Sequence, residues 1–510
     1  MKRWTRIVMN GIILSTIAIA IKSLPNIDKN PNLFHMDVKE KSSEPRTQYQ
    51  IQAELDHQQH TIRASETVSL KSKSSQDLDD LVFHLYPNSY NQVETMSNML
   101  AKPDPKLIAK EIQKNPSLTK KDFLGDIEVK DVSIRGKKVT YTQEKQVLKI
   151  QLPDPIQPNE HVEVKIDFVV KIPYGFQRLH YRDDFYSITK WYPILAMYDS
   201  KTGKWDEKPY YPDGESDFSE LSDYHMELKV PKEMTVAATG TEKEDINQNE
   251  KIIQVNAPNV REFVFFASPH YEKETRKVAG ITVNSYYDKR NAQSREIAVN
   301  GLNMVEKALS FFNEKFGPYA YPEFDIMETR VLGVNMEYPT IIQMGDYSNK
   351  ATKLSFVHEL AHQWFYGMIG NDPYQNPALD EAFAVFADQY FNEYDTKGKN
   401  GFKHYLSDKN ESIVRLPGVI NRPLNQYGPN EYGKYIYGKG GIALIDLYYK
   451  VGEQKFDQIM KTYFEKNKFT NATFANFFDV VSQVAGKENA DYIKKAFSLP
   501  DYHPTHLQKR

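Results

Sequence analysis

The alternation of apolar and polar residues predicts β-strands in the first half of the chain, from about residue 46 to 275. The clearest run has apolar residues at every second position from 162 to 172, the period of a strand with one buried face. Runs at 62–70 and 224–230 have the same period, and Pro and Gly cluster between them. The pattern favours an antiparallel sandwich-like domain. A polar, Lys-rich stretch at 91–125 interrupts it and is expected to be helical.

The period changes near residue 290. Apolar residues then recur at three- and four-residue intervals, as in an amphipathic helix that ends at Gly317-Pro318. From there to about 500 the pattern is mostly helical, with a short strand-like stretch at 322–343. We therefore predict a multidomain α+β fold, with an N-terminal antiparallel β-sandwich-like domain (46–275) followed by a mainly α-helical domain (276–510).

Residues 1–22 are typical of an export signal. Three positive charges precede an apolar run from Ile7 to Ile17, and Ala18-Ile19-Ala20 offers a small-x-small cleavage site. The run is short for a stable membrane span, which favours a cleaved signal peptide. An uncleaved signal anchor, with membrane attachment through residues 4–21, stays open. Both alternatives place the globular part outside the cytoplasm, either secreted or on the extracellular face of the membrane, and residues 23–45 form a linker.

Composition excludes several classes of protein. The 65 Lys and Arg nearly balance the 68 Asp and Glu, for a net charge of −3, so no global field favours nucleic acid as a partner. The chain has no cysteine, which excludes a disulfide framework, a thiolate zinc site and a catalytic thiol. Any bound metal must therefore be held by His and carboxylate side chains.

His358-Glu359-Leu360-Ala361-His362 matches the pattern H-E-x-x-H. Residues four apart lie on one face of a helix, so both imidazoles can reach one zinc ion. A catalytic zinc site keeps one coordination position open for water, whose pKa the metal lowers. Glu359 is placed to take a proton from that water. The alternative explanation is a buried helix whose two histidines are merely hydrogen-bonded.

Glu381 follows His362 by 19 residues and would complete a three-ligand catalytic site. Asn376-Pro377 is typical of a helix start, with Asn as the N-cap and Pro at the first helical position. Glu381 is therefore expected in the first turns of a second helix beside the first. Asp380 and Glu381 could instead be acids favoured at any helix N-terminus, although that does not explain the spacing.

This arrangement resembles the gluzincin aminopeptidases of the aminopeptidase N family, in a short form without their large C-terminal helical domain. Four ordered motifs carry the resemblance: the zinc motif with Glu381, Phe316–Ile326, Val334–Thr340 in the place of the family's G-A-M-E-N signature, and Tyr437-Gly438-Lys439-Gly440, which is similar to Tyr-x-Lys-Gly. The likeness runs from about residue 46 to the C-terminus. It implies a thermolysin-like catalytic domain, one zinc ion per chain and peptide substrates.

The resemblance also implies roles for individual residues. Tyr437 would donate its O–H to the tetrahedral oxyanion. Glu337 would bind the α-ammonium group of the substrate, with Met336 beside it in the substrate site. Without the family motif, nothing selects Tyr437 from a Tyr-rich run, and Glu337 could be an acid at a strand edge.

Two departures from the family pattern concern substrate binding. Val334 and Asn335 precede Met336 where the family has Gly and a small residue, which alters the wall of the first substrate pocket. No β-domain Gln or Glu matches the family residue that helps to hold the substrate's amino group. Residues 190–193 occupy about that place.

The sequence therefore predicts an exported zinc aminopeptidase that removes N-terminal residues from peptides. A zinc endopeptidase with the same site is the first alternative, favoured by the altered signature. A non-catalytic binding or scaffold module is the second, and the intact set of His358, Glu359, His362, Glu381 and Tyr437 argues against it.

Overall fold

The computed structural model describes residues 46–507, apart from 93–95, 97–103, 212–213, 247–249, 333–334, 350–353, 400, 407–411, 429 and 506. The predicted export signal and linker lie outside the described residues. In the part of the chain that is described, no helix is both long enough and apolar enough to cross a membrane.

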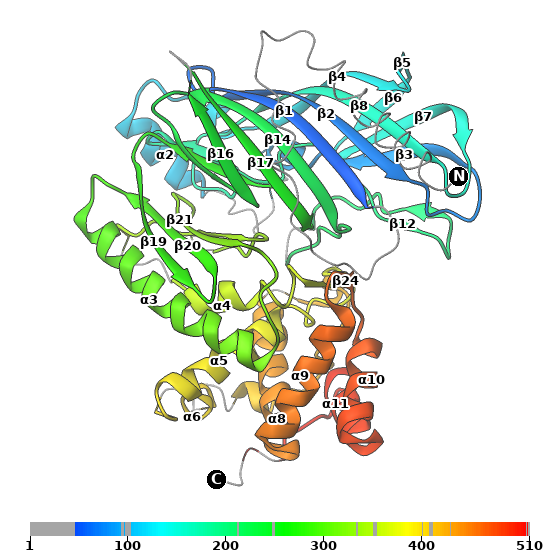
Figure 1. The fold of residues 1–510 in the computed structure, drawn as a ribbon, viewed down its shortest axis with the longest axis vertical. Helices are drawn as coiled ribbons and strands as arrows, with labels where there is room; N and C mark the ends of the chain where they lie inside the picture. The colour runs from blue at the N-terminus through cyan, green and yellow to red at the C-terminus, as the bar shows by residue number, and fades with distance from the viewer. Residues whose placement is uncertain are drawn as a thin grey trace, which may run out of the picture. The chain divides into compact units, whose positions relative to one another are not determined.

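An eight-stranded sheet dominates the first half of the described chain (Figure 1). Its strands, in spatial order, are β16 (Thr241–Ile246), β17 (Glu250–Val260), β14 (Ser222–Pro231), β1 (Thr47–Asp56), β2 (Thr61–Lys71), β8 (His161–Lys171), β4 (Asp126–Ile134) and β5 (Lys137–Lys138). Strands β2, β8 and β14 confirm the three predicted runs, and every second residue of β8 is buried. The purely antiparallel prediction was wrong for one pair, because β1 and β14 run parallel. Local alternation shows which residues are buried but not which distant strand pairs with which.

Two four-stranded sheets and a hairpin complete this β-rich region. They consist of β11 (Ile194–Leu195), β3 (Leu78–His84), β7 (Val147–Ile156) and β6 (Tyr141–Glu144); β15 (Thr235–Ala238), β18 (Phe265–Ser268), β10 (Phe185–Ile188) and β9 (His180–Arg182); and the hairpin β12 (Tyr198–Asp199) and β13 (Lys204–Trp205). The stretch at 91–125 contains α2 (Pro105–Lys114) and a 3₁₀ turn at Lys120–Phe123, so its helical prediction is confirmed where the chain is described.

A second sheet-and-helix unit follows in the chain. Its strands are β19 (Tyr271–Val278), β20 (Ile281–Asp288), β21 (Glu323–Glu328) and β22 (Ile341–Met344), and β20, β21 and β22 are parallel. Helix α3 (Ala292–Lys315) joins β20 to β21, as a parallel connection requires. The six apolar positions that predicted a helix near residue 290 are all buried: Ala298, Leu302, Val305, Leu309, Phe312 and Phe316. The predicted domain boundary at 275 falls inside β19, and the domain limits stay a prediction.

The remainder is mainly helical, as predicted, and these helices lie on the opposite side of the β19–β22 sheet from the eight-stranded sheet (Figure 1). The elements are α4 (Phe356–Ala361), β23 (Ile369–Gly370), α5 (Glu381–Asp395), α6 (Phe402–Tyr405), a 3₁₀ turn (Leu424–Gln426), a π-helical segment (Gly433–Gly440), α8 (Gly441–Val451), α9 (Glu453–Asn467), β24 (Thr470–Asn471), α10 (Phe474–Ala485) and α11 (Lys487–Ser498). One continuous apolar core extends from the β-rich region into these helices and includes the fully buried Trp191 and Trp364.

Candidate active site

The two histidines of the H-E-x-x-H motif lie on one side of α4. The helix is shorter than the motif requires: it ends at Ala361, and His362 is its C-cap. The His362 N–H nevertheless donates to the His358 carbonyl at 3.3 Å, so the helical spacing of the two side chains is preserved.

Glu381 is the first residue of α5, and the predicted start of this helix was wrong. Asn376 is not the N-cap; Asp380 is, and its carboxylate accepts the Glu381 N–H at 2.6 Å. The side chain of Asn371 donates to the other Asp380 oxygen at 3.1 Å. This contact from outside the helix holds the cap, and it places the Glu381 side chain beside the two histidines.

Three ligand atoms form an almost equilateral triangle. The Nε2 atoms of His358 and His362 are 3.2 Å apart, and each is 3.2 Å from Oε2 of Glu381. Ligands at three corners of a tetrahedron around an ion at about 2.0–2.1 Å stand about 3.3–3.4 Å apart. The triangle therefore has the size of one face of a tetrahedral zinc site.

The chemistry of the donors also fits a cation. The Phe365 carbonyl accepts from His362 Nδ1 at 3.1 Å, so Nδ1 carries the proton and the Nε2 lone pair faces the triangle. Burial lowers the pKa of His362, but the Glu381 carboxylate outweighs burial and raises it to about 9. The site thus favours positive charge where the metal would bind.

Two further carboxylates approach the triangle. Glu359 and Glu337 are buried, and each places an oxygen within 4.8 Å of the other and of a His362 ring nitrogen. Burial raises the pKa of Glu359 to about 7, which is a suitable value for a group that exchanges protons at neutral pH. Gln363 ties the Glu337 segment to α4, because its amide donates to the Tyr338 carbonyl at 3.1 Å and accepts the Thr340 N–H at 2.8 Å.

Glu215 is the residue that the sequence did not reveal. It lies in the loop before β14, and its carboxylate oxygen is within 4.8 Å of oxygens of Glu337 and Glu381. The guanidinium of Arg178 donates to it at 2.8 Å and holds its pKa below the usual range, although burial opposes this. Burial, and then the facing Glu215, raise the pKa of Glu337. The pKa values of the two acids are therefore shifted in opposite directions, and both acids face the metal triangle.

Residues 190–193 contribute no carboxylate to the site. They occupy about the place of the family residue that helps to hold the substrate's amino group. Lys190 is buried and paired with Asp217 and, at 3.0 Å, with Glu262. Glu215 reaches the site from about 25 residues further along the chain. Its local sequence, Asp213-Gly214-Glu215-Ser216-Asp217, indicates only an acidic loop.

Tyr437 lies on the π-helical segment. Its hydroxyl donates to Oε1 of Glu381, and its ring lies 5.9 Å from the His358 ring. Gly440 lets this segment approach α5, because a Cβ there would lie 2.7 Å from the Cβ of Ala382. Short π-helical segments are frequent at functional sites. This one brings Tyr437 to the metal triangle.

Met336 does not join the polar site through its side chain. It packs in a separate apolar cluster with Tyr338 and Met327, and its backbone pairs with Gln343 in both directions, at 2.9 and 2.8 Å. This pairing holds the backbone next to Glu337, and the substrate-binding role of Met336 stays a prediction.

The fold and the site together define a class. A β-rich region followed by a helical region, with two histidines and a distant glutamate as metal donors and a further glutamate between the histidines, is the arrangement of a gluzincin metallopeptidase. Residues 300–497 match the model of the Peptidase family M1 domain. This match supports the resemblance to the gluzincins of the aminopeptidase N type that the motifs predicted, and that family implies a zinc cofactor, which the three donors fit.

Curated relatives agree with this assignment at low identity. The chain is 24% identical over 226 residues to "Probable aminopeptidase 1" of Sulfurisphaera tokodaii, covering 39% of this chain and 28% of the relative. It is 23% identical over 401 residues to "Aminopeptidase 2" of Candida albicans, covering 71% of this chain and 42% of the relative. The chain thus spans less than half the length of these two proteins.

Solved structures match more of the chain. The M1 zinc metallopeptidase from Deinococcus radiodurans has a TM-score of 0.64 at 15% identity, and the match covers 91% of this chain and 96% of that one. A mutant of the Deinococcus enzyme bound to a Tyr-Ser-Ala substrate gives 0.62 at 16% identity, with the same coverage. This likeness shows that the fold is that of a two-domain M1 metallopeptidase with an N-terminal β-rich domain.

Proposed function

We propose that this protein is a zinc-dependent aminopeptidase that hydrolyses N-terminal residues from peptides. The observation that carries the proposal is the pair Glu215 and Glu337, whose carboxylates lie beside the metal triangle. Two acids there can hold an α-ammonium group and leave the first peptide bond of the substrate at the metal. A substrate that continued past this point would place an uncharged peptide group against buried carboxylates, which is unfavourable.

The proposed roles follow from the positions of the side chains. Zinc, when held by His358, His362 and Glu381, supplies a Lewis acid for the scissile carbonyl and a lowered pKa for water. Glu359 takes a proton from the attacking water and returns it to the leaving amine. Tyr437 turns its O–H from Glu381 to the developing oxyanion.

The finer architecture is also part of the proposal. We propose a sandwich-like arrangement of the β-rich region and a thermolysin-like arrangement of the region from 276 onward. A short sheet with parallel strands, the zinc motif helix and a following helix that supplies the third donor occur there in this order.

The test of the function compares two substrates that differ only at the amino group. An aminoacyl chromogenic amide should be hydrolysed at least about 100-fold faster than its N-acetylated form, because one charge-assisted contact to each of two acids is lost on acetylation. Glu359→Gln is the control for contaminating peptidases. Equal hydrolysis of the two substrates would favour the endopeptidase alternative, and bound zinc without Glu359-dependent turnover would favour the scaffold.

Tyr437→Phe should lower kcat by about 100- to 1,000-fold, the usual effect of removing one oxyanion donor. The substitution removes only the hydroxyl, so the zinc content and the melting temperature should stay close to those of the wild type. Steady-state kinetics with metal analysis checks this. A kcat within threefold of the wild-type value would show that Tyr437 takes no part in catalysis.

We also propose that the protein is exported. The support is the positively charged start, apolar run and small-x-small site within residues 1–22. Fractionation of cells that express the full chain, with N-terminal sequencing of the recovered protein, distinguishes a cleaved signal from an uncleaved anchor. Retention of the full chain in the cytoplasm would contradict both.

A further inference from the structure

The loop that carries Glu215 is held by buried cations. We call residues 210–219, of which 212–213 lie outside the described residues, the anchor loop. Arg178, with 1% of its side chain exposed, pairs with Glu215, whose side chain is 12% exposed. Two residues further on, Asp217 pairs with the buried Lys190. Glu215 and Asp217 therefore each pair with a buried cation.

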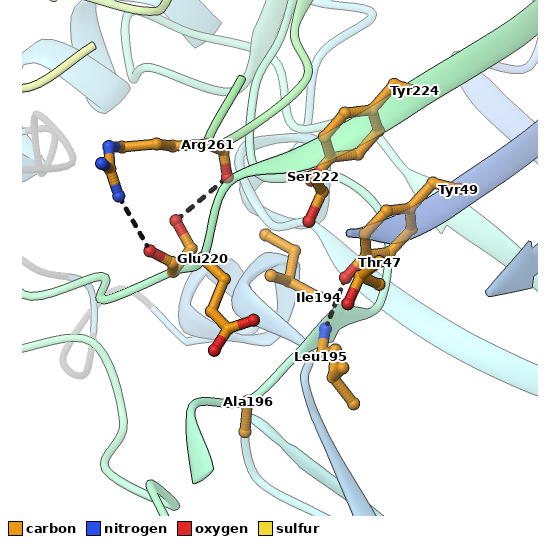
Figure 2. Close-up of a pocket in the computed structure, with 10 residues that line it drawn as sticks. Thr47, Tyr49, Ile194, Leu195, Ala196, Glu220, Ser222, Tyr224 and Arg261 are labelled. Carbon is orange, nitrogen blue, oxygen red and sulfur yellow. Dashed lines mark hydrogen bonds between the residues drawn. The ribbon is translucent and has the colours of Figure 1, made fainter. Parts of the chain in front are cut away.

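Contacts that do not involve Arg178 also hold the loop, at Gly214 and at Ser219. Gly214 has a φ of +87° and packs so closely that a Cβ would lie 2.6 Å from Leu424 Cδ2 and 3.1 Å from Tyr432 Cε2. At the far end, the Arg261 guanidinium donates to the Ser219 carbonyl at 3.3 Å, and the Ser219 hydroxyl donates to the Arg261 carbonyl at 3.0 Å. Figure 2 shows Arg261 beside a small pocket at the start of β1 and β14. The backbone of the loop is thus placed without Arg178.

Arg178 has contacts that a merely structural cation would not need. Its Nη2 donates to Glu215, and its Nη1 lies 3.4 Å from the Tyr210 hydroxyl at the start of the anchor loop. Its carbonyl accepts the Ser187 hydroxyl at 2.6 Å. The same hydroxyl accepts the Gln343 amide at 2.7 Å.

Gln343 links this group to the other acid of the pair, because its backbone is paired with Met336, which precedes Glu337. The Arg178 guanidinium is therefore bonded directly to Glu215. The Arg178 carbonyl is connected through Ser187 and the Gln343 side chain to Gln343, whose backbone pairs with the segment that bears Glu337.

We infer that Arg178 is the positioning residue of the amino-group site: its guanidinium holds the Glu215 carboxylate directed toward the substrate's α-ammonium, without touching the substrate itself. This rests on the proposed function. Removing Arg178 would leave Glu215 beside Glu337 with no cation, and two adjacent buried carboxylates turn apart or share a proton. In either case the site loses affinity for an ammonium group, while the metal triangle and Glu359 are unchanged.

The test uses the full chain and two chromogenic amides with the same acyl side chain, one with an α-amino group and one in which hydrogen replaces it. For Arg178→Gln, KM for the amino substrate should rise about 10- to 100-fold, the value of one hydrogen bond to a charged group. The rate of hydrolysis of the desamino substrate and the zinc content of Arg178→Gln should stay within about twofold of the wild-type values, because the substitution affects only the binding of the ammonium group.

A double-mutant cycle with Glu215→Gln tests whether Arg178 affects substrate binding through Glu215. If Arg178 acts through Glu215, the variant with both substitutions should bind the amino substrate no more weakly than Glu215→Gln alone. Arg178→Lys, which keeps the charge but not the fork of donors, should recover part of the affinity. Lys315→Gln is the matched control: it removes another largely buried cation, paired with Glu453 and Asp457, and should lower stability without changing the ratio of the two substrates.

Three results would overturn the inference: equal losses on both substrates, additive effects in the cycle, or an unchanged KM. Should Arg178→Gln not fold, Arg178→Lys and the variant with both substitutions give the same comparison, since removing a buried pair is tolerated better than removing one member. Wild-type protein that hydrolyses both substrates equally would remove the proposed function and this inference together. Discrimination by the wild type with an additive cycle would remove the inference alone.

Discussion

Glu359→Gln should abolish nearly all peptide hydrolysis and leave the protein folded and loaded with zinc. The amide cannot take a proton from water, and loss of general acid–base catalysis lowers kcat by about 100- to 10,000-fold. Glu359 is 6% exposed and lies within 4.8 Å of His362 and Glu337, but it is not part of the 3.2 Å triangle. Kinetics with metal analysis of the same sample checks both parts.

The result that contradicts this prediction is specific. If Glu359→Gln loses zinc together with activity, Glu359 is a ligand or holds the ligands, and the assignment of the triangle to His358, His362 and Glu381 is wrong. Glu314→Gln is a suitable comparison, because this acid on α3 also lies in the family M1 domain and takes no part in the site.

Removal of the metal should have the second large effect. Dialysis against a chelator should abolish activity, and one equivalent of zinc should restore it. A ligand present at about 1,000 times its Kd stabilises the folded state by about 4 kcal/mol. For a domain of about 150–250 residues, removal of the metal should therefore lower the melting temperature by about 8–16 °C. Differential scanning calorimetry before and after chelation measures this.

Three results would contradict the proposal that zinc is required for both activity and stability. They are full activity after exhaustive chelation, restoration by magnesium but not by zinc, and a melting temperature that does not respond to the metal. Magnesium prefers six oxygen ligands, and two imidazole nitrogens do not supply them.

The strands, the long helix α3 and the metal donors could be predicted because each depends on residues close together in sequence. Apolar alternation located β2, β8 and β14, and helical spacing put His358 and His362 on one face. The resemblance added Tyr437, which local reasoning could not separate from the other tyrosines around it. These parts required no knowledge of which distant segments meet.

The parts that were missed depend on contacts between distant segments. The start of α5 at Glu381 rests on the hydrogen bond from Asn371 to Asp380, whereas Asn376-Pro377 had the better local signal. The parallel pairing of β1 with β14 joins strands about 175 residues apart. Glu215 reaches the metal site because contacts with distant segments place the anchor loop: packing of Gly214 against Leu424, and the pairing of Glu215 with Arg178.

Elemental mass spectrometry after extensive dialysis should give the zinc content of the purified full chain and of its Glu381→Ala variant, and so test the metal site itself. A triangle of His358, His362 and Glu381 predicts one zinc per wild-type chain and a large loss of zinc in the variant. Wild-type protein that hydrolyses peptides without bound zinc, or a variant that keeps its full zinc content, would contradict the account.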